Sequence, residues 1–395
     1  MTDAAQPLAG IKVVEFTHMV MGPAAGVILA DLGAEVVKIE PLDGDNTRRL
    51  RGSGGGYFSM YNRNKASLCL DLKSEGGLQL AKDVITASDI MIENFRPGAM
   101  DKLGLSYAAL QQLNPALIYC SLKGFLSGPY AHRTALDEVT QMMGGLAYMT
   151  GLPDKPMRAG SSVIDITGGM FGVIGILAAL EERHRSGLGK HVSSSLFETT
   201  AFMVGQHIAQ QGVLGVEPPP MSVRSSAWSV YDIFQSSEGE RVFVGVVSDS
   251  LWQRFCAEFA LDALAADPAY AKNNDRVKLR DTLIPMLQEL FAGLSHSELM
   301  ERLDKAGVPF APINKPIDLV SDPHLLEGGG LLDITLSDGS IIKLPALPLE
   351  FDQQKTTLYR DLPAPGEGSR AHLEKLGIAP EAIDALDRDG LLIAG

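Results

Sequence analysis

Met157 to Ala179 reads MRAGSSVIDITGGMFGVIGILAA, and the rest of the chain is organised around this stretch. It passes from a polar loop through one acidic residue, Asp165, to a Gly pair and an apolar run without charge until Glu181. The pattern predicts a helix that starts near Thr167. Its small residues leave room for close backbone packing against a neighbour; they are Gly168, Gly169, Gly172 and Gly175. A carboxylate just before a helix either caps free N–H groups or acts as a nucleophile beside them, and residue type alone favours the cap.

Length and charge narrow the class of protein. The 395 residues exceed what one core usually supports, so two domains are expected. The net charge of -14 argues against nucleic acid as a partner. The three widely spaced cysteines predict neither disulfides nor a metal site and fit a reducing cytoplasm. The N-terminus lacks the pattern of a targeting peptide, and the run Met170 to Leu180 reads as too short and too Gly-rich to span a membrane.

The first forty residues predict a βαβ unit. Ile11 to Phe16 and Glu35 to Glu40 are short β-branched runs, and Ala24 to Leu32 between them has a helical pattern closed by Gly33. The loop after the first strand of such a unit is the usual position of a ligand. His18 lies on that loop, and a satisfied turn residue and a site residue are equally good interpretations of it.

Three predicted strands in this half end in polar residues. Beyond the first strand, Ile90 to Glu93 is followed by Asn94-Phe95-Arg96, and Leu117 to Leu122 is followed by Lys123. Because the carboxyl ends of parallel strands meet at one edge of a sheet, we expect these side chains to line one ligand crevice.

The pattern changes after the Pro-rich segment Glu217 to Pro220, which is a good candidate for a domain boundary. Tyr231 to Phe234 and Arg241 to Val247 predict a hairpin, and helical segments follow it up to Ala306. This region reads as a separate, smaller α+β unit.

These residues resemble the class III CoA-transferases, the group that includes formyl-CoA transferase and, with the same fold, alpha-methylacyl-CoA racemase. The similarity covers nearly the whole chain and includes the Asp165 region. The other pieces that carry it are LAGIKVVEFTHMVMGP (Leu8–Pro23), DLGAEVVKIEP (Asp31–Pro41), YNRNKASLCLDLKSEGG (Tyr61–Gly77), ENFRPGAMDKLGL (Glu93–Leu105) and SLKGF (Ser121–Phe125).

The resemblance implies an α/β fold with a Rossmann-like large domain built from both chain ends and a smaller α+β domain. The large, CoA-binding domain would be residues 1–217 and 331–395, and the small domain residues 221–330. Two copies would interlock as linked rings in a homodimer.

The resemblance also implies the site. Asp165 would be the nucleophile, ionised at neutral pH without tuning. The acyl pocket and its oxyanion donors would be Gly168, Gly169 and Met19. CoA or acyl-CoA would be a substrate, and no cofactor would be bound permanently. The residues expected to hold CoA are His18, Val20, Leu70, Lys73, Asn94, Phe95, Lys102 and Lys123.

We expect succinyl-CoA as donor and a small dicarboxylate of the itaconate, mesaconate, malate or citramalate class as acceptor. Arg48 and Arg51 are the preferred partners of a distal carboxylate, with Arg49, Arg63 and Lys65 as further candidates. Formyl-CoA transferase has a Gly-rich loop over the acyl site that this chain lacks between Trp228 and Glu327, which argues against formyl-CoA and oxalate.

Two alternatives stay open at this stage. One is a racemase or isomerase of the same fold, although Leu136 replaces the proton-transferring His of the racemases. The other is a CoA-binding protein without catalytic activity.

Overall fold

The computed structural model describes residues 6–224 and 226–395 of the chain. The chain forms two compact units: the larger joins Met1–Ser222 to Asp322–Gly395, and the smaller is Val223–Ser321. Each unit has a hydrophobic core of its own. The domain borders expected from the sequence, and the assignment of CoA to the larger domain, stay predictions.

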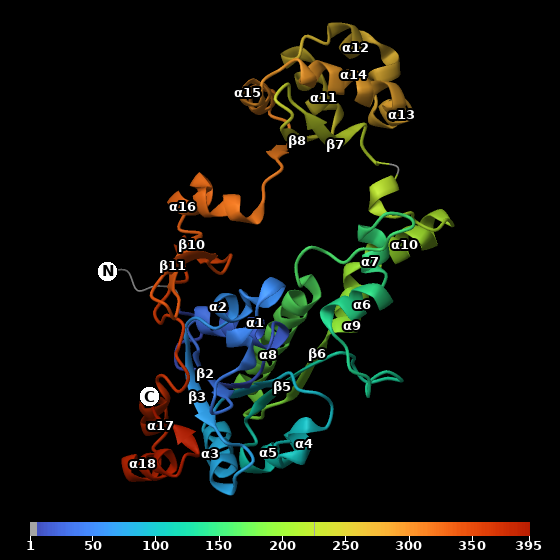
Figure 1. Cartoon of the computed structure of the whole chain (residues 1–395). Coiled ribbons are helices and arrows are strands. Elements are labelled where there is room, and N and C mark those ends of the chain that lie inside the picture. Colours follow the sequence, from blue (N-terminus) through green and yellow to red (C-terminus); the bar gives the residue numbers. More distant parts are fainter. Residues whose placement is uncertain (1–5, 225) are drawn as a thin grey trace. The chain divides into compact units, whose positions relative to one another are not determined.

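A seven-stranded sheet in the order β14-β3-β2-β1-β4-β5-β6 forms the centre of the larger unit (Figure 1). The strands β1 to β6 run parallel, and β14 pairs antiparallel with β3. In the middle of the sheet, Val14 of β1 is aligned with Val37 of β2 and Met91 of β4. The predicted α/β fold with a mainly parallel sheet is therefore confirmed. The strands are β1 Lys12–Phe16, β2 Glu35–Glu40, β3 Lys65–Leu70, β4 Ile90–Glu93, β5 Ile118–Lys123, β6 His191–Ser195 and β14 Leu392–Ile393.

Helices cover both faces of this sheet. Successive strand residues point to opposite faces. Val14 therefore joins a core with α3, α5, α17 and α18, whereas Val13 joins a core with α1 and α8. The result is a three-layer α/β arrangement. The covering helices are α1 Met21–Asp31, α3 Glu75–Thr86, α5 Tyr107–Leu113, α8 Val163–Ser186, α17 Ser369–Lys375 and α18 Pro380–Arg388.

Helix α8 begins at Val163, earlier than the start near Thr167 expected from the sequence. Asp165 therefore lies in the first turn of the helix and not before it. The cause is a side chain from another element: the Asp137 carboxylate accepts hydrogen bonds from the backbone N–H groups of Ile164 and Asp165, at 2.9 and 3.0 Å. The first N–H groups of a helix have no partner within the helix, so this carboxylate serves as its cap.

The glycines of α8 allow close packing, as the sequence predicted. A Cβ atom at Gly169 would lie 2.7 Å from the carbonyl oxygen of Met21 in α1, and one at Gly172 would lie 2.6 Å from Leu122 of β5. At 24 residues, α8 is long and apolar enough to cross a membrane by length and composition. The expectation that the apolar run in α8 is too short to span a membrane is therefore wrong. The contacts of α8 with α1, β5 and β6 nevertheless make it a core helix of this unit.

The segment 136–150 forms two short helices, α6 and α7. Gly145 adopts φ of 84°, a left-handed conformation that ends the first helix and turns the chain into the second. Other elements of the larger unit are α2 Tyr57–Tyr61, α4 Ala99–Lys102, α6 Asp137–Met143, α7 Leu146–Thr150, α9 Leu196–Met203, α10 Gly205–Leu214, α16 Pro323–Glu327, β10 Leu331–Thr335, β11 Ile341–Pro345, β12 Glu350–Phe351 and β13 Gln354–Lys355.

The smaller unit is a three-stranded antiparallel sheet, β7-β8-β9, packed with helices around Trp252, Phe255 and Phe291. The predicted hairpin, whose turn is near residue 238, is formed by the antiparallel strands β7 and β8. Its elements are β7 Val230–Gln235, β8 Arg241–Val246, β9 Phe310–Pro312, α11 Asp249–Glu258, α12 Asp262–Ala266, α13 Asn273–Lys278, α14 Arg280–Ala292 and α15 His296–Ala306.

Candidate active site

A cavity of about 330 Å³ lies in the larger unit, among the loops that follow β1, β4 and β5 and the first residues of α6 and α8. The structure brings to it the polar residues that follow these three strands, as the sequence predicted. Of the predicted site residues, those that line it are His18, Met19, Val20, Asn94, Phe95, Lys123 and Asp165.

The loop after β1 is held in a strained conformation. Met19 has φ of 63°, which is rare for a residue with a side chain and often marks a functional site. Its N–H donates to Thr47 Oγ1 at 3.2 Å. Asn94 exchanges two hydrogen bonds with the backbone of His18, and the buried Lys38 ammonium donates to the Thr17 carbonyl at 2.6 Å. The loop is thus fixed in place before any ligand arrives.

The aromatic pair His18 and Phe95 forms one wall of the cavity. The two rings lie 5.5 Å apart in a tilted arrangement. Burial lowers the pKa of His18, so the imidazole is neutral at pH 7. A neutral ring beside an aromatic side chain offers a flat surface and one hydrogen-bond donor to a ligand.

Asp165 has a free carboxylate at the cavity. Among the residues that the structure describes, none makes a hydrogen bond or ion pair with its side chain, whose exposure is intermediate. Burial first, and then the neighbouring Asp137 carboxylate, raise the pKa of Asp165 to about 7, against the opposing charge of Arg158. The expectation of a carboxylate ionised without tuning is therefore wrong: near pH 7 the group is divided between its two protonation states.

Asp137 and Arg158 are site residues that the sequence did not reveal. Besides capping α8, Asp137 accepts a hydrogen bond from Gln141 at 2.6 Å and lies 3.4 Å from the Arg158 guanidinium. Arg158 also lies 3.8 Å from Glu138. The sequence shows Asp137 as an isolated acid and Arg158 as a base in the polar loop before the predicted helix, and nothing in the sequence indicates that the two lie together.

The structure gives Gly168 and Gly169 a different role from the predicted oxyanion donors. Both are buried outside the cavity lining, against Met21 and Ala25 of α1. They lie beyond the first turn of α8, so their N–H groups bond within the helix. Their lack of a side chain serves helix packing.

Four of the predicted CoA contacts need qualification. Leu70 is buried in the core, so it offers no side chain to a ligand. Lys73 and Lys102 are exposed and outside this cavity, and their contacts with CoA stay predictions. Lys123 lines the cavity, but its ammonium is paired with Glu93 at 2.5 Å, which offsets much of its charge.

Most of the arginines and lysines proposed for a substrate carboxylate are structural. Arg48 makes two bonds to Glu40 and one to the Pro363 carbonyl. The others in ion pairs are Arg49 with Asp43, Arg63 with Asp31, and Lys65 with Glu15. Arg51 is exposed and lies outside the cavity, so its predicted role stays untested.

Three other arginines line the cavity in their place: Arg96, Arg133 and Arg158. In the described part of the chain, Arg96 and Arg133 have no ion pair, and Arg133 lies over the rings of Phe125 and Tyr130. Leu136 lines the cavity with a side chain that cannot transfer a proton. Within residues 6–224 and 226–395, no group of three or more His, Cys, Asp or Glu side chains is placed to hold a metal ion.

Comparison with known proteins finds relatives that match nearly the whole chain. The sequence model described as CoA-transferase family III matches residues 8–369. The acetyl-CoA:oxalate CoA-transferase of Acetobacter aceti is 33% identical over 381 residues, which cover 91% of this chain and 96% of that protein. The succinate–glutarate CoA-transferase of Agrobacterium fabrum is 32% identical, covering 95% of this chain and 97% of the relative. The crystal structure of a CAIB/BAIF family protein from Brucella suis matches with a TM-score of 0.82 and 33% identity, covering 94% of this chain and 99% of that one.

The structure is thus that of an α/β protein with a free carboxylate beside a strained loop, at the carboxyl ends of its parallel strands, and the comparisons give its family. The chain belongs to CoA-transferase family III, which confirms the resemblance found in its sequence. It is a transferase that uses CoA thioesters as substrates.

Proposed function

We propose that this enzyme moves CoA from succinyl-CoA to a small dicarboxylic acid, with Asp165 as the covalent nucleophile. The observation that carries the proposal is the Asp165 carboxylate, which lines the cavity without a partner among the described residues. The similar enzymes from Acetobacter and Agrobacterium are named for oxalate, succinate and glutarate, all dicarboxylates. Itaconate, mesaconate, malate and citramalate belong to the same chemical class.

The proposed reaction needs two intermediates. The Asp165 carboxylate attacks the thioester carbonyl, which forms a mixed anhydride and releases CoA thiolate. The thiolate then attacks the aspartyl carbonyl, forming an aspartyl-CoA thioester and releasing the donor acid. The acceptor carboxylate repeats these steps in reverse, so CoA leaves on the acceptor and Asp165 regains its carboxylate. Water takes no part, and the thioester energy is retained.

The positions of the three arginines around the cavity support separate roles in binding the acyl group and CoA. Arg158 is the cation whose charge acts on Asp165, so it would meet the acyl group and its distal carboxylate. Arg96 and Arg133, both exposed, would meet the phosphates of CoA, with His18 and Phe95 beside the pantetheine arm.

An acceptor screen with succinyl-CoA tests the substrate class. We expect transfer to dicarboxylates of four or five carbons and little transfer to monocarboxylates of equal length. In Arg158→Gln, KM for glutarate should rise about tenfold relative to KM for valerate, because only glutarate loses a charge-assisted hydrogen bond. Comparing two acceptors in one variant cancels any effect on Asp165 itself. Transfer confined to monocarboxylates would contradict the proposal.

We also propose that two copies form an interlocked homodimer. Large apolar side chains are exposed on neighbouring helices of the larger unit, including Phe202 of α9 at 72% and Val213 of α10 at 82%. Ile174 of α8, Ile208 of α10 and Leu214 are exposed as well. Large apolar side chains exposed on several helices are typical of a subunit interface. We propose a cytoplasmic location, which the three free cysteines support.

Sedimentation equilibrium tests the homodimer. We expect a particle of twice the 42.3 kDa chain mass. Phe202→Asp with Val213→Asp should shift it toward the monomer, because charges are costly to bury in an apolar interface. Leu113→Asp, at an exposed leucine of α5, is the control and should leave the mass unchanged. A wild-type monomer at micromolar concentration would refute the homodimer.

A further inference from the structure

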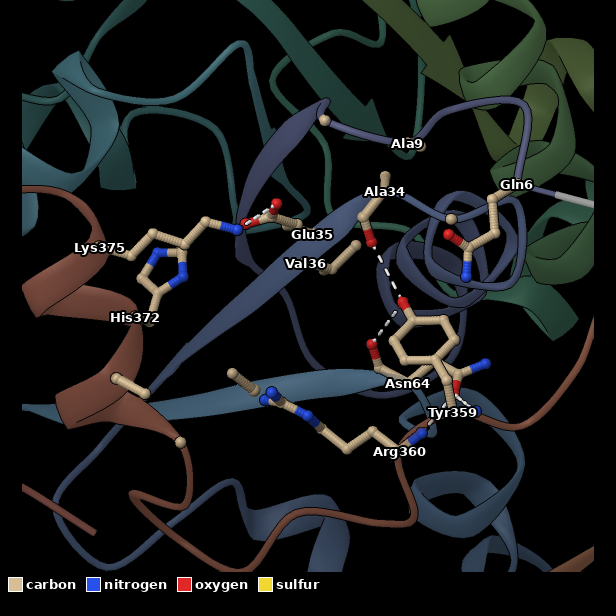
Figure 2. Close-up of a pocket in the computed structure, with 15 residues that line it drawn as sticks. Gln6, Ala9, Ala34, Glu35, Val36, Asn64, Tyr359, Arg360, His372 and Lys375 are labelled. Atoms are coloured by element: carbon tan, nitrogen blue, oxygen red, sulfur yellow. Dashed lines mark hydrogen bonds and ion pairs between the residues drawn. The ribbon is translucent and has the colours of Figure 1, made fainter. Parts of the chain in front are cut away.

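A second cavity, of about 460 Å³, lies in the larger unit away from Asp165. It opens where β2 and β3 begin: Glu35 is the first residue of β2, and Asn64 directly precedes β3 (Figure 2). The active-site cavity lies instead at the carboxyl ends of β1, β4 and β5, which form the opposite edge of the same parallel sheet. The two cavities share no lining residue.

Arg360 is fixed at its backbone and free at its guanidinium. Its N–H donates to Asn64 Oδ1 at 3.0 Å, and its carbonyl accepts from the Asn64 N–H at 2.9 Å. The N–H of the preceding residue, Tyr359, donates to the same oxygen, and the Tyr359 hydroxyl lies within hydrogen-bond distance of the Ala34 carbonyl. Yet the Arg360 guanidinium makes no hydrogen bond or ion pair with any residue that the structure describes. It extends along the cavity toward α17 (Figure 2).

Gly368 keeps the space that this guanidinium occupies. A Cβ atom there would lie 2.8 Å from Arg360 Nη1, and Gly368 has φ of +79°, which disfavours any residue with a side chain. The backbone therefore leaves the arginine room beside the cavity.

Positive charge exceeds negative charge around this cavity. Lys12, Arg360 and Lys375 act on His372, and Glu35, paired with Lys375 at 2.5 Å, is the opposing acid. Burial and these three cations lower the pKa of His372 to about 4 despite Glu35. His372 Nε2 is buried and has no partner in the described part of the chain. A local positive field in a chain of net charge -14 indicates an anionic ligand.

We propose that this cavity is a second ligand site, which binds a small organic anion of the carboxylate or phosphate class through Arg360 and Lys375. Its volume is within the range of small-molecule sites, so it holds a ligand larger than a single inorganic ion. The anion pairs with the free guanidinium and supplies the negative charge that the surroundings of His372 lack. The site is independent of the covalent chemistry at Asp165.

Histidine NMR on the full chain, with CoA at saturation to fill the active site, tests this proposal. Inorganic phosphate and citrate are the two probes, and they distinguish phosphate from carboxylate ligands. The His372 signal is identified by its loss in His372→Gln. We expect one probe or both to raise the pH midpoint of His372 by about one unit, a tenfold change in its proton affinity. No shift with either probe at about 10 mM would overturn the proposal.

Substitutions test which side chains bind the anion. Arg360→Gln should weaken binding at least tenfold, and Lys375→Gln by a smaller factor, whereas Arg388→Gln on exposed α18 should bind as wild type does. CoA transfer in the absence of the probe should stay unchanged in Arg360→Gln, because this residue lies outside the active-site cavity. Wild-type affinity in Arg360→Gln would overturn the assignment. The wild-type NMR shift is a separate test that does not depend on the Arg360 or Lys375 variants.

Discussion

Asp165→Ala is expected to lower kcat for CoA transfer by at least about 10⁴-fold, because no other group takes over a missing covalent nucleophile. The measurement is steady-state transfer from succinyl-CoA to glutarate, with CoA binding followed by calorimetry. CoA affinity should change little, since the side chain makes no contact that holds the cavity walls together. Asp154→Ala, in the exposed loop between α7 and α8, is the control and should keep full activity.

Trapping the intermediate separates a nucleophile from a carboxylate that only assists. Hydroxylamine added during turnover attacks an aspartyl anhydride or thioester and leaves a hydroxamate on the protein. Mass spectrometry should find this modification on the peptide that contains Asp165 and nowhere else. Full turnover in Asp165→Ala, or a hydroxamate on a different residue, would contradict the proposed reaction.

The sheet of the larger unit was predictable because its signals are local. Short apolar runs such as Lys12–Phe16 and Ile90–Glu93 are buried on both faces, and parallel strands require that composition. Parallel topology alone predicts that the polar residues after the strands lie at one edge of the sheet. His18, Asn94 and Lys123 indeed line one cavity.

Contacts between distant residues were not predictable. Arg48, Arg63 and Lys65 read as a basic cluster, but each is paired with an acid from another strand or helix: Glu40, Asp31 and Glu15. The start of α8 was missed for the same reason, since its cap is a side chain 28 residues earlier in the sequence.

Gly168 and Gly169 show how one sequence feature supports two functions. A glycine pair beside an acid is compatible with an oxyanion site and with close helix packing. Only the position of α1, whose Met21 carbonyl would lie 2.7 Å from a Cβ at Gly169, decides for packing. The burial that raises the pKa of Asp165 is likewise a property of the assembled fold and not of the residue type.

Asp137 is the positioning residue of this site, and its replacement gives the second large effect. Asp137→Ala leaves the N–H groups of Ile164 and Asp165 without their acceptor. Loss of a helix cap costs about 1 kcal/mol of stability. Displacing the first turn of α8 moves the nucleophile, and a shift of about 1 Å can cost about 10²-fold in kcat. Glu138→Gln is the matched control: it removes a neighbouring charge that touches Arg158 but neither N–H group.

Asp137→Asn distinguishes the charge of this residue from its hydrogen bonds. The amide oxygen can still accept from both N–H groups, but the like charge that helps raise the pKa of Asp165 is gone. In wild type the ionised nucleophile accumulates as pH rises through about 7, so kcat/KM should rise with pH and then level off. At pH 6 it should be about tenfold below its plateau. In Asp137→Asn the rise should move to lower pH, so the variant keeps a larger fraction of its own plateau at pH 6. An unchanged midpoint would show that the Asp137 charge does not affect the pKa of Asp165 and would leave Asp137 with the cap as its single role.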